Sequence, residues 1–192
     1  MGERDMPPLV PKDRAAGAGG ITFRVLKAPA NGHGRVRRSR AVFELPEIVT
    51  LARQMADTLT GAVVSSCERG NSPHKWVWYS KEPEEYEAIL VGRTLGAAGA
   101  QGNRVILPVE PGWALSIGDM GGKITLHSEG DALPKKRHLL LGFEDGRHLS
   151  VCVQGWGGIW LAEEGMPAGF QEIDDRADPI SDEFTYDRFK AL

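Results

Sequence analysis

The stretch HLLLGFEDGRHLSVCV, residues 138–153, decides the fold, because it holds two short apolar runs on either side of a turn. The turn contains Asp145-Gly146, and an Asp-Gly pair favours the backbone angles of a tight connection between two strands. The apolar runs at residues 138–141 and 149–153 have the length of strands rather than of helices. We therefore predict an antiparallel β-hairpin at this place.

Short runs of the same kind lie on both sides of the hairpin, and turn residues such as Glu110-Pro111-Gly112 separate them. Several are rich in β-branched and aromatic residues, as is typical of strands. The chain lacks the alternation of strands and helices that a Rossmann or barrel fold requires. About eight short strands at this spacing predict an antiparallel β-sandwich. The six further strands are expected at residues 62–67, 76–79, 104–107, 113–117, 124–126 and 159–161.

One long helix is expected before the sandwich, from about Pro46 to Leu59, where apolar residues recur at steps of three and four. Pro46 suits a first helical position, and Glu47 places a negative charge near the positive end of the helix dipole. A second, short helix is expected to begin near Pro83. The predicted fold class is therefore mainly β (α+β): an antiparallel β-sandwich preceded by one long helix, with a short inserted helix.

Residues 1–42 differ in composition from the rest of the chain, since they are rich in Gly, Ala, Pro and Arg and show no sustained period. Such a segment buries too little apolar surface to offset its chain entropy, so we expect a disordered basic extension. The abrupt change at Val42 supports a second hypothesis, in which the extension is a start-site artefact and the natural chain begins at position 42. A tryptic peptide from residues 15–35 in the natural protein would exclude that hypothesis.

The sandwich is expected to span residues 43–164, and the polar, acidic residues 165–180 are expected to form a linker. Ser181-Asp182-Glu183-Phe184 then has the pattern of a helix cap and first helical turn. Residues 181–192 are therefore predicted to start a second, helical domain that this chain does not complete.

The net charge of −3 is divided unevenly along the chain. Residues 1–42 carry nine Lys or Arg and three Asp or Glu, whereas residues 43–192 carry fourteen and 23. Proteins that bind duplex DNA usually present a basic surface, because their affinity depends on neutralising phosphates. The acidic balance of the globular part counts against strong DNA binding and favours a protein partner, although it is compatible with a local basic stripe.

Composition and cysteine usage indicate the setting of the protein. Apolar residues make up 41% of the chain and charged residues 26%, an ordinary globular balance. No apolar run approaches the ~20 residues that span a bilayer, and no apolar block follows the N-terminal charges as in a secretory signal. Cys67 and Cys152 form no C-x-x-C pair, so we expect two small buried thiols in a cytoplasmic protein without a metal site.

The segment Phe43-Glu44-Leu45-Pro46-Glu47-Ile48 resembles the opening Pro-Glu-Leu-Pro-Glu-Val of the formamidopyrimidine-DNA glycosylase and endonuclease VIII family. The hairpin around Glu144-Asp145-Gly146 resembles that family's Phe-Glu-Asp-Gly hairpin, and the segment that starts at Ser181 resembles the beginning of its helix-two-turn-helix domain. Ser72-Pro73-His74-Lys75-Trp76 resembles a divergent branch of the family with an altered N-terminus. The resemblance implies a leading helix followed by a β-sandwich, as predicted above.

The resemblance also implies a chemistry. In that family a terminal proline amine attacks C1′ of the damaged nucleotide, a Schiff base forms and the strand is cleaved, while the next glutamate acts as a general acid/base. Phe43 occupies the proline position here, and its nitrogen is an amide that cannot form a Schiff base. Glu44 and Glu47 are the remaining catalytic candidates. The alternatives are that Glu44 is only a helix-start carboxylate and that Glu47 is only a partner of the helix dipole.

Several loop residues match DNA contacts of the family. Asn103 stands where the family has a lysine, and Trp156 stands where it has an aromatic wedge, preceded by Gln154 in place of an arginine. Met120 resembles a methionine that enters the gap left by a flipped base. The alternatives are a plain hairpin turn at Gly121-Gly122 and a core position for Trp156.

Two further groups complete the candidates for DNA binding. Lys135-Lys136-Arg137 is a small basic patch at the start of a strand, and it either contacts phosphate or is a solvated charged turn. Trp76, Trp78 and Tyr79 have aromatic faces that suit base stacking, but their strand spacing favours core and cross-strand packing.

Two functions follow from the sequence. The first is a DNA base-excision-repair glycosylase or abasic-site lyase-like domain that acts on damaged double-stranded DNA and is impaired or inactive as this chain, because the proline and the second domain are missing. The alternative is a non-catalytic module that binds damaged DNA or a protein partner. No cofactor is expected, since the zinc finger of the family is absent from this chain.

Overall fold

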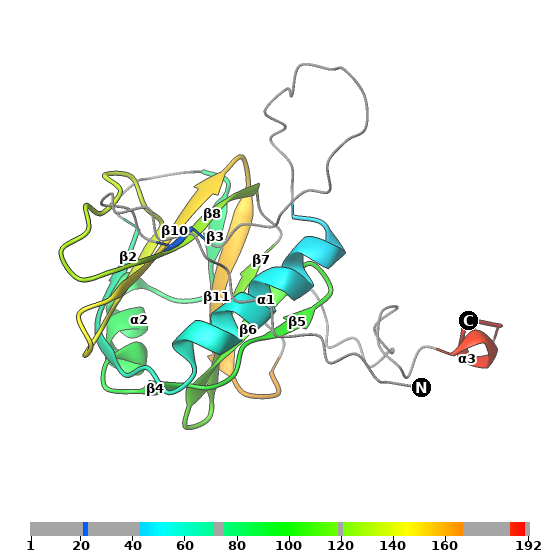
Figure 1. Cartoon of the computed structure of the whole chain (residues 1–192). Helices are drawn as coiled ribbons and strands as arrows, with labels where there is room; N and C mark the ends of the chain where they lie inside the picture. Colours follow the sequence, from blue (N-terminus) through cyan, green and yellow to red (C-terminus); the bar gives the residue numbers. More distant parts are fainter. Residues whose placement is uncertain (1–20, 23–42, 71–74, 119–120, 167–184, 191–192) are drawn as a thin grey trace, which may run out of the picture.

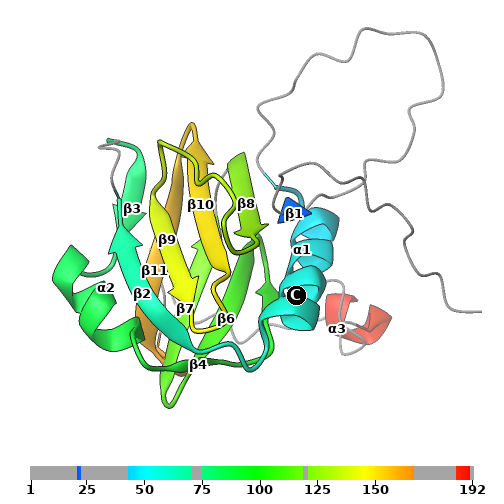
Figure 2. The same ribbon diagram turned by 60° about the vertical axis from the view of Figure 1, so that its left-hand side comes forward.

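The computed structural model describes residues 21–22, 43–70, 75–118, 121–166 and 185–190 of the chain. In these ranges two β-sheets face each other, and the long helix α1 (Leu45–Leu59) closes one open side between them (Figures 1 and 2). The short helix α2 (Pro83–Leu90) lies on the opposite side. The prediction of a mainly β (α+β) fold with one long and one short inserted helix is confirmed.

The first sheet is antiparallel throughout and contains the predicted hairpin. Leu149 pairs with Leu141 and Val151 pairs with Leu139, so the two apolar runs lie in register. Gly146 in the turn has a φ of +81°, a conformation that glycine adopts without steric cost. The strand order is β1 (Ile21–Thr22), β8 (Gly121–His127), β10 (His148–Gln154), β9 (Leu139–Phe143) and β2 (Val64–Arg69).

The second sheet departs from purely antiparallel pairing at one edge. There β3 (Val77–Tyr79) runs parallel to β11 (Gly157–Glu163), and Val77 pairs with Gly157. The two strands are far apart in the sequence, so no hairpin turn fixes their relative direction. The order continues from β11 through β7 (Trp113–Gly118) and β6 (Arg104–Glu110) to β4 (Thr94–Leu95), and β5 (Gly99–Gln101) pairs with β6.

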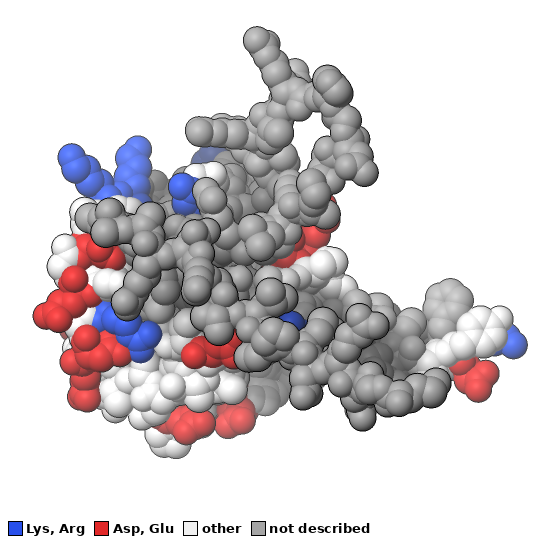
Figure 3. Space-filling view, viewed as in Figure 1, with Lys and Arg blue, Asp and Glu red and all other residues white. Residues whose placement is uncertain are grey.

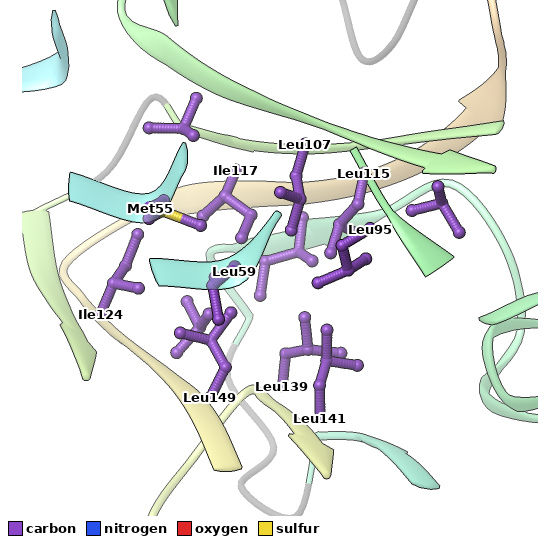
Figure 4. Packing of buried hydrophobic residues seen from close by; sticks show 14 of the residues in the cluster. Met55, Leu59, Leu95, Leu107, Leu115, Ile117, Ile124, Leu139, Leu141 and Leu149 are labelled. Carbon is purple, nitrogen blue, oxygen red and sulfur yellow. The ribbon is translucent and has the colours of Figure 1, made fainter. Parts of the chain in front are cut away.

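The apolar face of α1 is part of the core between the sheets. Figure 4 shows Met55 and Leu59 pointing toward Ile117 of the second sheet and toward Ile124 and Leu149 of the first. All five side chains are at most 2% exposed. Full burial of such a side chain stabilises the fold by roughly 1.5–3 kcal/mol. The helix therefore contributes to the stability of both sheets.

The segment containing β3 and α2 is attached to β11 by hydrogen bonds from two hydroxyl groups. Tyr86 of α2 is fully buried, and its hydroxyl donates a hydrogen bond to the Ile159 carbonyl at 2.5 Å. Burial raises the pKa of Tyr86 above its ordinary value, so the hydroxyl keeps its proton as a donor. The Ser80 hydroxyl donates to the Leu161 carbonyl at 2.7 Å. These bonds fix the parallel edge of the second sheet.

Two glycine-containing segments belong to strands. Residues 99–101 form strand β5, and only Gly102 and Asn103 turn. Gly121-Gly122 do not form a hairpin turn, because they begin β8 and pair with Gln154 and Val153. In both places the neighbouring strand, rather than the local glycine content, determines the conformation.

The expected segments at the two ends of the chain are described only in part. In the predicted extension 1–42, Ile21–Thr22 form β1 and pair with β8, so these two residues are a sheet edge rather than a disordered segment. The other residues of that extension, most of the predicted linker and Ser181–Phe184 lie outside the described residues. Within the predicted helical start at 181–192, residues Tyr186–Lys190 form the short helix α3.

Candidate nucleic-acid interface

One end of the sandwich collects strand ends from both sheets. Gln154 at the end of β10 pairs with Gly121 at the start of β8, and Arg69 at the end of β2 pairs with Leu139 at the start of β9. The second sheet joins at the same end, because β11 starts at Gly157, only two residues after Gln154. The β10–β11 connection lies at the top of Figure 1. Residues that are far apart in the sequence therefore meet there.

We call this region the basic end. Lys123 belongs to it because it pairs with Cys152 of β10, and Lys136 belongs to it because its carbonyl accepts a hydrogen bond from the Cys152 thiol at 3.0 Å. Asn103 belongs to it because it precedes Arg104, which pairs with the last residue of β7. The basic end is defined by Lys75, Trp76, Asn103, Lys123, Lys135, Lys136, Gln154 and Trp156.

Every predicted DNA contact that the structure describes lies at the basic end. The side chains of Lys135, Lys136, Gln154 and Trp156 are exposed, and that of Asn103 is half-buried in the β5–β6 turn. Met120 is also a predicted contact, but it lies outside the described residues. Lys123 is not predicted as a DNA contact from the sequence, because a single lysine within a strand carries no local signal of its position.

Charge is separated along the molecule. Figure 3 shows most Lys and Arg side chains at the upper end of the described surface and most Asp and Glu side chains below them. The acidic balance of residues 43–192 therefore does not describe the basic end, which is a local basic surface of the kind that the sequence left open. We call the opposite region the acidic end and define it by Glu82, Glu84, Glu85, Glu87, Glu110, Glu144, Asp145, Glu163 and Glu164.

Trp156 is exposed because of the way in which the chain passes between the sheets. Gly155-Trp156 is the whole connection from β10 in the first sheet to β11 in the second. Gly155 has a φ of +94°, which a residue with a side chain rarely adopts. The Trp156 side chain is 47% exposed, so of the two alternatives that the sequence leaves open, the structure favours the exposed ring over a core position.

Trp76 differs from the sequence prediction. Core packing was expected for all three aromatic residues between positions 76 and 79, but Trp76 is 49% exposed, while Trp78 and Tyr79 are half-buried. The difference arises because β3 begins only at Val77, so Trp76 lies in the turn before the strand. The Lys75 ammonium nitrogen lies 4.8 Å from the centre of the Trp76 ring, within the range of a cation–π interaction.

The start of α1 carries the candidate catalytic residues. Phe43 is partly buried and packs against the core, Glu44 is exposed, and the Glu47 carboxylate accepts a hydrogen bond from the Glu44 N–H at 3.1 Å. Glu47 therefore has a structural role as part of a capping box. The other end of α1 lies near β4, where the Gly61 N–H donates to the Leu95 carbonyl at 2.8 Å. The helix thus runs from the basic end toward the acidic end (Figure 1).

The third residue of the basic patch at 135–137 has a structural role. Arg137 donates to the Glu68 carboxylate at 2.6 Å and to the Pro134 carbonyl at 3.1 Å. Next to it, the His138 ring accepts a hydrogen bond from the Val153 N–H at 2.9 Å. These contacts join the loop before β9 to β2 and β10, so the backbone that carries Lys135 and Lys136 is held in place.

Nucleophilic and metal-binding groups are not gathered in the part of the chain that the structure describes. Burial raises the pKa of the half-buried Cys67 thiol to about 12, which keeps it protonated at neutral pH. Among the described residues no group of three or more His, Cys, Asp or Glu side chains is placed to hold a metal ion. In the same ranges no helix has the length and apolar character needed to cross a membrane.

Comparison with known sequences defines the family. The sequence profile of the formamidopyrimidine-DNA glycosylase N-terminal domain matches residues 43–154. Formamidopyrimidine-DNA glycosylase of Bacillus licheniformis is 29% identical over 151 residues, which cover 75% of this chain and 52% of that protein. The protein of the same name from Chloroflexus aggregans is 27% identical over 146 residues, with coverage of 74% and 51%. The chain spans about half the length of the curated relatives that it matches.

Solved structures agree with the sequence profile. The complex of Lactococcus lactis Fpg with abasic-site-containing DNA has a TM-score of 0.55 and 27% identity, and the match covers 64% of this chain and 44% of that protein. The complex of the same protein with DNA that contains Fapy-dG gives a TM-score of 0.54. The fold is therefore that of a DNA-glycosylase N-terminal domain. Through this domain, the chain belongs to the formamidopyrimidine-DNA glycosylase family.

Proposed function

We propose that the described domain binds damaged double-stranded DNA through the basic end, as part of a base-excision-repair protein of the glycosylase and abasic-site lyase type. The observation that carries the proposal is the convergence of Asn103, Lys135, Lys136, Gln154 and Trp156 on one end of the sandwich. Lysines neutralise phosphates, amide side chains hydrogen-bond to the backbone, and an exposed indole stacks on a base. Membership of the family supports the same interpretation.

We further propose that glycosylase and lyase chemistry is impaired in this chain. The family profile begins to match at Phe43, the residue that the resemblance assigns to the proline position. The Phe43 side chain packs against the core, and its nitrogen is part of a peptide bond, so it offers no nucleophile. Glu44 and Glu47 are engaged with each other in the capping box at the start of the helix, and the exposed Glu44 side chain is the one that we propose as a general acid/base. The two free thiols support a reduced, cytoplasmic location.

A second candidate function is a non-catalytic binding module on the same fold. The packing of Phe43 and the capping role of Glu47 favour it, because both residues then serve the structure alone. Under this second candidate function, the basic end binds damaged DNA without cleaving it, and the acidic end provides a separate surface for a protein partner. The two candidates share the DNA-binding step and differ only in chemistry.

Borohydride trapping on a duplex with a single abasic site separates the two candidates. The experiment compares the full chain, a version that starts with Met at position 42, and that shorter version with Phe43→Pro. If the missing nucleophile is the only reason for the lack of chemistry, the full chain gives no covalent adduct. The shorter Phe43→Pro version then gives one after its initiator Met is removed. An adduct with the full chain would overturn the proposed impairment and point to a lysine nucleophile.

Fluorescence anisotropy on the same duplex tests the binding step. The full chain is expected to bind, and its affinity is expected to fall as salt rises, because binding releases counterions from the phosphates. A folded full chain that shows no affinity for the abasic duplex at low salt would exclude both candidate functions.

A further inference from the structure

The basic end carries a second exposed tryptophan. We propose that Trp76, together with Lys75, forms a stacking site for an unpaired nucleobase of the bound DNA, separate from Trp156. This inference rests on the proposed DNA binding and adds a base-contacting site to it. The Trp76 ring takes the base and the Lys75 ammonium group takes an adjacent phosphate.

The backbone brings the two tryptophans to adjacent strand starts. β3 and β11 run parallel, with Val77 opposite Gly157, so Trp76 and Trp156 each precede the first residue of a paired strand. The Gly157 N–H donates to the Trp76 carbonyl at 3.0 Å, which ties the two connections together. Neighbouring strands in a sheet lie about 4.8 Å apart. The backbones that carry the two exposed indoles are therefore adjacent at the edge of the second sheet.

The surroundings of Trp76 hold its ring at the surface. The ring contacts Trp78 edge-on, with centroids 6.4 Å apart and planes inclined by 62°. Lys75 lies over the ring, at 4.8 Å from its centre. Nevertheless 49% of the side chain is exposed, and large exposed aromatic groups beside one another commonly mark binding sites. An indole that is fixed before binding loses little conformational entropy when a base stacks on it.

Charge identifies the occupant as nucleic acid. Lys123, Lys135 and Lys136 are exposed at the same end of the sandwich, so the end that carries the two indoles also carries positive charge. A combination of aromatic rings and basic side chains is the arrangement by which proteins bind unpaired nucleotides, since every base has a face that stacks and every nucleotide carries a phosphate. An apolar protein partner would be complementary to the rings but not to the lysines.

The acidic end offers an internal control. There Lys81 lies 5.3 Å from the centre of the Trp113 ring, so a lysine–tryptophan contact is present at both ends of the sandwich. Trp113 is half-buried against the core and pairs with Glu163. It therefore lacks both the exposure and the basic surroundings of Trp76. Equal substitutions at the two positions separate base stacking from the general effect of removing an indole.

The test measures binding of the full chain to three fluorescent probes: a duplex with one abasic site, the matched intact duplex and single-stranded oligothymidine. Trp76→Leu is expected to weaken binding to the abasic duplex and to oligothymidine by about 5- to 100-fold, the effect of losing one base–aromatic stack. Binding to the intact duplex is expected to stay unchanged, because its bases are paired. Trp113→Leu is expected to leave all three affinities unchanged, and Trp76→Phe is expected to retain most of the affinity.

Three results would overturn the inference. The first is that Trp76→Leu binds the abasic duplex with the affinity of the wild type. The second is that Trp113→Leu loses as much affinity as Trp76→Leu, and the third is that Trp76→Leu loses as much affinity for the intact duplex as for the abasic duplex. If Trp76→Leu does not fold, quenching of tryptophan fluorescence by oligothymidine is compared between the wild type and Trp76→Phe. Unchanged quenching would then reject the site. If the wild type binds none of the probes, the proposed function itself fails, which is distinct from a loss confined to Trp76.

Discussion

The two ends of the sandwich are built from the same strands but differ in chemistry. Each has a lysine over a tryptophan: Lys75 lies 4.8 Å from the Trp76 ring at the basic end, and Lys81 lies 5.3 Å from the Trp113 ring at the acidic end. Trp76 is exposed, whereas Trp113 packs against the core. A lysine beside a tryptophan is therefore not enough to indicate a binding surface, and neither is the net charge of the domain. The exposure of the ring and the charge around it distinguish the two ends.

The carboxylates of the acidic end have structural roles that explain part of their abundance. Glu85 accepts a hydrogen bond from the Glu82 N–H at 2.9 Å and so caps α2. Asp145 accepts hydrogen bonds from Arg147 in the β9–β10 hairpin turn, which keeps the pKa of its carboxyl below the ordinary value. The negative charge of the globular part is therefore partly a product of its caps and turns, and it is compatible with a basic surface elsewhere.

The largest effect is expected from a change that damages both ends at once. Leu59→Ala removes a fully buried side chain that lies between the sheets, so the free energy of unfolding is expected to fall by about 2–5 kcal/mol. Urea denaturation followed by circular dichroism measures it. Val91→Ala, at a residue that is 40% exposed, is the control and is expected to change stability by less than about 0.5 kcal/mol. Equal effects of the two variants would show that α1 is not part of the core.

The next largest effect is expected from charge reversal at the basic end. Lys135→Glu with Lys136→Glu is expected to lower the affinity for abasic duplex by about 10- to 100-fold at low salt, since two phosphate contacts become repulsive. The slope of log affinity against log salt is expected to decrease by about 2. Anisotropy titrations over a series of salt concentrations measure both quantities.

Lys81→Glu is the matched control at the acidic end. Lys81 lies 3.8 Å from the Glu85 carboxylate, and this exposed pair contributes little to stability. The control variant is therefore expected to bind the duplex like the wild type. If Lys81→Glu lowers the affinity for the duplex as much as the changes at Lys135 and Lys136, the affinity depends on the net charge of the protein alone. The two ends would then not differ in DNA binding.

The sequence predicts the strands of the sandwich better than it predicts the interface. Alternating runs and the Asp145-Gly146 turn carry local signals, so the hairpin register follows directly from the pattern. Exposure of Trp76 depends on where β3 begins, which is decided by its pairing with β11, about 80 residues away along the chain. Separation of charge into two ends likewise depends on which loops meet in space. Resemblance to a family identified Trp156 as a candidate DNA contact, whereas no local pattern pointed to Lys123.

A smaller effect is expected at the start of α1, where Glu47 has both a structural and a catalytic interpretation. Glu47→Ala removes the acceptor of the Glu44 N–H, so stability is expected to fall by about 0.5–2 kcal/mol. Glu44→Ala is expected to lower stability by a similar amount, because the Glu44 side chain accepts a hydrogen bond from the Glu47 N–H in the same capping box. Thermal denaturation measures both losses. If Glu47→Ala leaves stability unchanged, the capping interpretation is wrong and a role toward DNA becomes the better one.

The smallest effect concerns pH, which is expected to act on the fold but not on the contacts of the basic end. His127 is buried, its Nε2 lies 2.8 Å from the Ser150 hydroxyl, and burial lowers its pKa from the ordinary 6.5, with His148 acting in the same direction and Asp131 opposing it. The unfolded chain therefore takes up this proton more readily than the folded domain. The stability that neutral His127 provides is present above pH 6.5 and is lost as the pH falls below that value.

His127→Gln is the variant that isolates this contribution, because glutamine can bond to Ser150 and does not titrate. Urea denaturation between pH 7.5 and pH 5.5 is expected to show a smaller loss of stability for the variant than for the wild type. The affinity of the folded domain for abasic duplex is expected to be the same for both proteins at each pH, because the two proteins have the same side chains at the basic end. Identical pH dependence of stability in the two proteins would show that His127 titrates alike in the folded and unfolded states. If the affinity for the abasic duplex changes with pH in the wild type but not in His127→Gln, the protonation of His127 affects DNA binding. The interior of the first sheet and the basic end would then not be independent.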